Sequence, residues 1–134
     1  MRQACCRVAS SRWRALAATL VFALFAPGVL AQAPAEIEAT MQTMLAAVQA
    51  GSLADFVAAG APEFRAGMTK RMLDSVSEQL APRLRQGYTA SFLGTLKQQA
   101  FTVYVWKLEF KDGKDDVLVT LAAKGGHVGG FWLR

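Results

Sequence analysis

Apolar and polar side chains alternate most regularly near the end of the chain. From Tyr104 to Phe110 every second residue is aromatic or aliphatic, and the run from Val117 to Ala123 alternates in step with it. A period of two predicts β-strands, and the charged, glycine-containing segment between the runs predicts a hairpin. One predicted face of the first strand carries Ala100, Thr102, Tyr104, Trp106, Leu108 and Phe110, and the other carries Phe101, Val103, Val105, Lys107 and Glu109.

The turn of this hairpin can form in two ways. A two-residue Asp112–Gly113 loop is a strong hairpin signal, but it places Glu109 opposite Asp116, which brings two like charges together. A four-residue loop places Lys111 opposite Asp116 instead. Both registers keep the same residues on the same faces of the sheet.

Two further strands are predicted on either side of the hairpin. The run from Tyr88 to Leu96 has strand character, and Gly94 predicts a bulge or a close backbone approach within it. Gly125 and Gly126 predict a second hairpin turn, which returns the chain as a strand from Val128 to Leu133. The expected sheet is therefore an antiparallel meander.

Helical periodicity characterises the chain before these strands. Apolar residues recur every three or four positions between Ala35 and Ala50, which predicts a helix that Gly51 ends. Ser52, followed three residues later by Asp55, predicts a capped start for a short second helix. Pro62 suits the first turn of a third, equally brief helix.

The last predicted helix begins at Thr69, whose hydroxyl can cap it, and closes at Gly87. Pro82 lies within this stretch, so we expect it to kink the helix or to restart it as a new first turn. Helices that precede an antiparallel meander predict an α+β fold, with N-terminal helices packed on a curved four-stranded antiparallel sheet. The apolar stripe of this last helix consists of Met72, Leu73, Val76, Leu80 and Leu84.

Residues 1–31 are expected to be a secretory signal peptide. Four arginines and no acidic residue precede an apolar run from Ala15 to Leu30, which is shorter than the roughly 20 residues of a membrane-spanning helix. We expect cleavage before Gln32, because the alternative site before Pro34 would place a proline where it hinders the peptidase. The remaining chain, residues 32–134, is expected to be a single domain that is periplasmic or secreted.

Loss of this leader changes the charge and the cysteine content. The chain has 15 basic and 10 acidic residues, and removal of four arginines leaves 11 against 10, so the high pI does not indicate binding to nucleic acid. Cys5 and Cys6 leave with the leader. The domain is therefore expected to have no disulfide, thiol nucleophile, cysteine-ligated metal or stable membrane anchor, and no cofactor is predicted.

Four short motifs are distributed over this domain: Gly87-Tyr88, Tyr104-Val105-Trp106, Phe110-Lys111-Asp112-Gly113, and Gly126 through Trp132. They resemble the nuclear transport factor 2-like (cystatin-like) superfamily, and within it small exported bacterial domains of unknown function. The resemblance implies a bent sheet wrapped around a helix to form a cone, whose mouth can hold a ligand or an active site. These motifs are mostly structural and do not specify a function.

Aromatic side chains are the first candidates for a site, as the floor of a pocket for a flat or apolar ligand, although the alternative is that they form the core. Ketosteroid isomerases and polyketide cyclases, which resemble this superfamily, need a carboxylate or a histidine inside the cone. The expected inward-facing strand positions hold no acid, so an enzyme of that type is the alternative hypothesis and no catalytic residue is assigned. The candidate aromatic residues are Tyr88, Tyr104, Trp106, Phe131 and Trp132.

His127, the only histidine of the chain, is a further ligand-binding candidate because its ordinary pKa lies near neutrality. It follows a Gly-Gly turn without an adjacent acid or amide, which favours an exposed turn residue over a catalytic base. Asp112, Asp115 and Asp116 form an acidic cluster that lacks the EF-hand pattern. We therefore expect a solvated hairpin tip there, and no metal site.

The second face of the predicted sheet is largely apolar at one end. If helices cover the Trp106 face, this second face would be exposed, and a homodimer that pairs sheet to sheet would cover it. Strong curvature of the sheet, with both faces buried by the early helices, is the alternative. We expect a binding or interaction domain, with a second copy or a small apolar ligand as its partner. The expected dimer-interface residues are Phe101, Val103, Val105 and Leu118.

Overall fold

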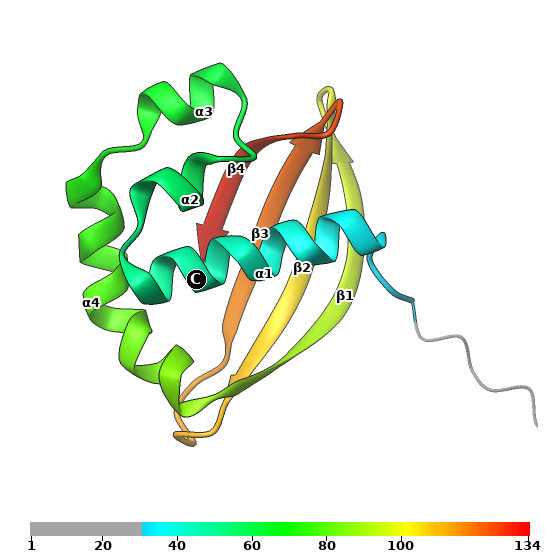
Figure 1. Cartoon of the computed structure of the whole chain (residues 1–134). Helices are drawn as coiled ribbons and strands as arrows, with labels where there is room; N and C mark the ends of the chain where they lie inside the picture. The colour runs from blue at the N-terminus through cyan, green and yellow to red at the C-terminus, as the bar shows by residue number, and fades with distance from the viewer. Residues whose placement is uncertain (1–30) are drawn as a thin grey trace, which may run out of the picture.

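The computed structural model describes residues 31–134, which form four helices followed by one antiparallel sheet (Figure 1). The expected α+β fold, with N-terminal helices on a four-stranded antiparallel sheet, is confirmed. Apart from Ala31, the predicted signal peptide with Cys5 and Cys6 lies outside the described residues. The elements are α1 (Ala35–Ala50), α2 (Leu53–Val57), α3 (Pro62–Gly67), α4 (Lys70–Gln86), β1 (Tyr88–Gln98), β2 (Phe101–Phe110), β3 (Val117–Lys124) and β4 (His127–Leu133).

Local contacts fix three helix ends where the sequence predicts them. Gly51 adopts a φ of 67° and donates its N–H to carbonyls of the last turn, which ends α1. At the start of α2, the Ser52 hydroxyl accepts the Asp55 N–H at 3.4 Å and donates to the Asp55 carboxylate at 2.7 Å. The Thr69 hydroxyl accepts a first-turn N–H of α4 at 3.3 Å. None of the described helices is long and apolar enough to span a bilayer.

α4 is one continuous helix through Pro82, so the chain does not restart there. Pro82 is exposed, whereas Ala81 and Leu84 are buried against the core on either side of it. Proline has no backbone N–H, so one hydrogen bond of the helix is absent at Pro82. Packing of the residues on both sides of the proline keeps the helix continuous there. Met72 also departs from the predicted apolar stripe, because it is 51% exposed.

The sheet has the order β1-β2-β3-β4, which makes β1 and β4 its edges. Trp106 pairs with Val119, and both side chains are buried on the helical side, as the alternation predicts. A bulge interrupts β1 at Gly94, which is also as expected. The turn from β1 to β2 differs from the prediction, because it lies at Gln99 and Ala100, and Gln99 has a φ of 53° that residues other than glycine seldom adopt.

The β2–β3 hairpin adopts the register of the two-residue loop, although that register opposes two like charges. Leu108 pairs with Val117, which brings Glu109 level with Asp116. The ladder ends before that pair, and the chain opens into a longer loop. Lys107 offsets the repulsion, because its ammonium lies 3.2 Å from the Glu109 carboxylate and 3.8 Å from that of Asp116.

The core lies between α1 and the sheet, and Figure 1 shows α1 crossing the strands on one face. None of the described residues that are buried is polar or charged, so apolar packing stabilises this layer. The opposite face of the sheet carries no helix (Figure 1). The most deeply buried side chains of the core are Met41, Met44, Leu45 and Val48 from α1, with Trp106, Leu108, Val119, Leu121 and Val128 from the strands.

A charged contact joins the end of α4 to the β2–β3 loop. Arg83 donates to Asp112 Oδ2 and to the Asp115 carbonyl, each at 2.7 Å, and its guanidinium lies 4.0 Å from the centre of the Phe110 ring. The Arg83 hydrogen bond, followed by the Lys114 N–H, lowers the pKa of Asp112. The expectation of a solvated tip is therefore wrong for Asp112, which is anchored to α4.

Replacing Arg83 by Met is expected to lower the free energy of unfolding most at neutral pH. The folded-state pKa of Asp112 lies below its ordinary value of 3.8, so the stabilisation from its charge is present above that value and is lost as the pH falls through the folded-state pKa. The stability difference between wild type and Arg83→Met should therefore shrink in acid, where only the contacts of Arg83 with the Asp115 carbonyl and the Phe110 ring remain. Denaturant unfolding at pH 7 and pH 2.5 measures this difference.

The control for this prediction is Lys107→Met, which removes partly exposed ion pairs. It should change the free energy of unfolding by less than about 1 kcal/mol at either pH. A stability difference between wild type and Arg83→Met that is the same at both pH values would contradict a charge-dependent contact.

Candidate functional site

A cavity of about 650 Å³ lies on the helical side of the sheet, between the start of α1 and the strands β1 and β2. Small and apolar residues form most of its lining, and Glu38 is the ionisable residue among them. The lining consists of Ala31, Gln32, Ala33, Ala35, Glu38, Ala90, Ser91, Phe92 and Trp106.

The Glu38 carboxylate is held by two hydrogen-bond donors. Trp106 Nε1 donates to Oε2 at 2.7 Å, and Gln42 Nε2 donates to Oε1 at 3.1 Å. Because the Trp106 side chain is only 1% exposed, its N–H needs this acceptor. Burial, and then the charge of Glu38, raise the pKa of Tyr88, so its hydroxyl stays protonated at neutral pH. Glu38 thus ties α1 to β2 at the edge of the cavity.

This arrangement can place a hydrogen-bond acceptor beside a small ligand, but it lacks the partners of an acid–base site. Both oxygens of Glu38 already accept hydrogen bonds, and His127 is exposed next to the β3–β4 turn. Within residues 31–134, no three His, Cys, Asp or Glu side chains come together in a way that could hold a metal ion. The geometry therefore favours an anchoring role for Glu38.

The sequence interpretation missed Glu38 because it considered acids only on strand positions. Glu38 lies three residues before Met41 and seven before Leu45, so it falls on the core-facing stripe of α1. An acidic residue on an otherwise apolar stripe was the available signal.

The face of the sheet opposite Trp106, which we call the outer face, exposes a group of large apolar side chains. Alternation along the strands places Leu96, Leu118 and Trp132 on it, and Leu93 projects there from the β1 bulge. Of the five large apolar side chains that are exposed among the described residues, these are four, and Met72 of α4 is the fifth. The outer face is thus an uncovered apolar surface.

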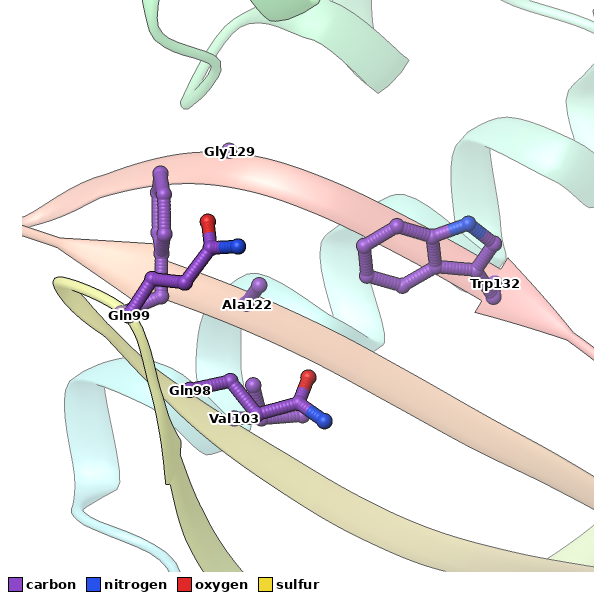
Figure 2. A pocket seen from close by; sticks show the side chains of 7 residues that line it. Gln98, Gln99, Val103, Ala122, Gly129 and Trp132 are labelled. Carbon is purple, nitrogen blue, oxygen red and sulfur yellow. The ribbon is translucent and has the colours of Figure 1, made fainter.

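A cleft of about 460 Å³ lies at one end of the outer face. Figure 2 shows Trp132 at one end of this cleft and Gln99 at the other. Two glycines of β4 bring aromatic rings against the backbone, because a Cβ on Gly130 would lie 2.1 Å from the Trp132 ring and one on Gly129 would lie 2.3 Å from the Phe101 ring. The cleft is lined by Gln98, Gln99, Phe101, Val103, Ala122, Gly129 and Trp132.

The predicted ligand-binding residues do not share one site. Tyr88, Tyr104 and Trp106 lie on the helical side, and the ring of Tyr104 is centred 6.2 Å from that of Trp106. Trp132 lies on the outer face, and His127 lies at the β3–β4 turn. The expected single aromatic floor is therefore not formed.

The predicted dimer-interface residues all belong to the outer face, but they differ in exposure. Leu118 is exposed and Phe101 and Val105 are half-buried, whereas Val103 is only 3% exposed and offers little surface. The sequence interpretation missed other members of this face because the β1 bulge shifts the alternation and because Trp132 was assigned to the aromatic floor. These further members are Leu93, Leu96 and Trp132.

Replacing Trp106 by Phe is expected to lower the free energy of unfolding by about 2 kcal/mol, since it removes the donor to Glu38 and leaves a void in the core. Urea unfolding of the variant measures the loss. Tyr104→Phe, which keeps the neighbouring ring, is the control and should change stability by less than about 0.5 kcal/mol. If the effects of Trp106→Phe and Glu38→Ala simply add in the double variant, the two side chains are not coupled.

The likeness of this chain to known proteins lies among solved structures. No protein-family model matches the chain, and no curated protein matches it. Among solved structures, the chain is similar to an uncharacterised cystatin-fold protein from Novosphingobium aromaticivorans, whose crystal structure was determined at 1.90 Å resolution. The two chains are 14% identical with a TM-score of 0.36, over 76% of this chain and 99% of that chain.

Proposed function

We propose that this domain acts by non-catalytic association, and that its outer face pairs with the outer face of a second copy. The observation that carries the proposal is the concentration of exposed apolar side chains on one uncovered face. Leu93, Leu96, Leu118 and Trp132 are each between 44% and 56% exposed there. Apolar surface gathered in this way is typical of interaction sites.

The size of the outer face is adequate for a stable interface. Four strands spaced about 4.8 Å apart, with seven to eleven residues of about 3.3 Å each, cover roughly 600 Å² in projection. The accessible area is larger than this projection because side chains project from the surface. A standard interface needs about 800 Å² from each partner, so nearly the whole outer face would take part.

The distribution of charge on the outer face supports the same proposal. Lys107, Glu109 and Asp116 form their ion pairs at the end of the face near the β2–β3 loop. The middle of the face is largely apolar and includes the Trp132 indole, with Thr120 as the polar residue between Val105 and Trp132. Interfaces commonly have an apolar centre with an aromatic residue and a charged rim, and a two-fold axis would let one patch meet itself.

We further propose that the chain is exported through residues 1–31 and that it belongs to the nuclear transport factor 2-like superfamily. The leader composition supports export, because four arginines precede a short apolar run. The sequence motifs, together with a sheet that carries α1 across one face (Figure 1), support the superfamily assignment. The associating unit would then be the domain of residues 32–134.

A second candidate function is the binding of a small apolar molecule in the cavity beside Glu38. The observation that favours it is that the Glu38 carboxylate lines the cavity. Tyr88 lies close enough for the charge of Glu38 to raise the pKa of its hydroxyl. An isomerase or cyclase would need an acceptor and a donor that both face the ligand, whereas Glu38 lines the cavity and Tyr88 does not. Native mass spectrometry of protein purified from its export compartment reports any retained small molecule and the subunit number together.

Replacing both Leu96 and Leu118 by Gln is expected to weaken the dimer roughly a hundredfold, because each change removes apolar contact on both subunits. Sedimentation over a range of protein concentrations measures this shift. Met72→Gln is the matched control, since it removes an equally exposed apolar side chain from α4 and should leave the dimer unchanged. A wild-type protein that is monomeric at high concentration would disprove the proposal.

A further inference from the structure

β4 is an edge strand, and one part of its free edge is already paired. Ala61 donates its N–H to the Val128 carbonyl at 2.8 Å, and the Val128 N–H donates to the Ala59 carbonyl at 2.9 Å. These two bonds form a single parallel bridge at Gly60. The segment before α3 thus pairs with this edge at one residue, so the outward main chain of β4 bonds to an extended segment there.

The remaining part of the β4 edge directs main-chain groups away from the sheet. Arg134 and Leu118 exchange both of their backbone hydrogen bonds, at 3.0 and 2.7 Å, so the main chain of Arg134 faces β3. Residues that face the partner strand alternate with residues that face away from it in an antiparallel pair. Leu133 and Phe131 therefore direct their N–H and C=O groups toward the open edge.

An apolar groove of about 330 Å³ runs beside this part of the edge, between β4 and α4. Its polar lining residues are Ser75 and Gln79, and no charged residue lines it. Met72, the exposed large apolar side chain of α4, lines this groove. The apolar residues on which the argument depends are Met68, Met72, Val76, Leu80, Phe131 and Leu133.

We propose that this groove binds a segment of a partner protein in extended conformation, as a strand added to β4. The unpaired main-chain groups of Phe131 and Leu133 call for an occupant that offers its own main chain, which excludes a helix or a lipid tail. Alternate side chains of the added strand would lie against Met72 and Val76, so they must be apolar and uncharged. The added strand would continue the line that the Gly60 segment begins.

The affinity of the full chain for a labelled peptide tests this proposal. The probe is an acetylated and amidated Thr-Val-Thr-Val-Thr-Val-Thr carrying fluorescein, and the comparison peptide has the same sequence with every internal amide N-methylated. Fluorescence anisotropy should show saturable binding of the probe and at least about tenfold weaker binding of the methylated peptide. Hydrogen exchange of the Phe131 and Leu133 amides should slow when the probe is bound.

Two variants locate the binding in the groove. Met72→Lys changes an exposed position and should weaken probe binding about tenfold. Leu133→Pro, which removes an outward N–H, should weaken it as well. Leu96→Gln on the outer face is the control and should leave peptide affinity unchanged, which separates this proposal from outer-face dimerisation.

Three results would overturn the inference. One is equal affinity for the methylated and unmethylated peptides, which would mean that the main chain is not recognised. Another is an absence of probe binding, or binding that Met72→Lys and Leu133→Pro both leave unchanged. The third is a comparison by native mass spectrometry in which the wild-type protein is a dimer and the Met72→Lys variant is a monomer. That result would identify a second copy as the occupant.

Discussion

The contact between α1 and the sheet is the packing interaction on which the rest of the structure depends. Trp106 is the largest of the most deeply buried side chains, and it fills the space between α1 and the middle strands. Its indole N–H is satisfied by Glu38, so a bulky aromatic ring is buried there without an orphaned polar group. The same residue thus provides apolar burial and a directional bond, which fixes how the helix lies on the strands.

The helices cover only one face of the sheet, which leaves the other face and parts of the sheet edges exposed. α1 crosses one face only, so the strands keep a second face whose alternate residues are apolar and uncovered (Figure 1). The order of the strands also leaves two edges, and a short segment before α3 covers only part of one of them. The two surfaces proposed for association therefore follow from one architectural fact, which is that the helices are too few to enclose a four-stranded sheet.

Local chemistry made much of the fold predictable from the sequence. Helix ends depend on contacts within a few residues, and the caps at Gly51, Ser52 and Thr69 form as expected. Strand faces follow from alternation, which places Trp106 and Val119 together.

The features that escaped prediction depend on contacts between distant parts of the chain. In the observed β2–β3 register, Lys107 approaches two acidic residues at once, which offsets the like-charge pair that counted against this register. Continuity of α4 through Pro82 depends on burial of the residues around it. The turn at Gln99 carries no glycine or asparagine signal, and the place of Glu38 in the candidate site appears only once α1 lies on β2.

The pair Gly129 and Gly130 determines the relief of the outer face. With hydrogen atoms in place of side chains, the backbone of β4 lets the rings of Phe101 and Trp132 settle against it, within what would be the space of a methyl group. The two rings consequently border the cleft at this end of the outer face, and a side chain at either glycine would displace one of them. Two absent Cβ atoms thus determine where the aromatic walls of this hollow stand.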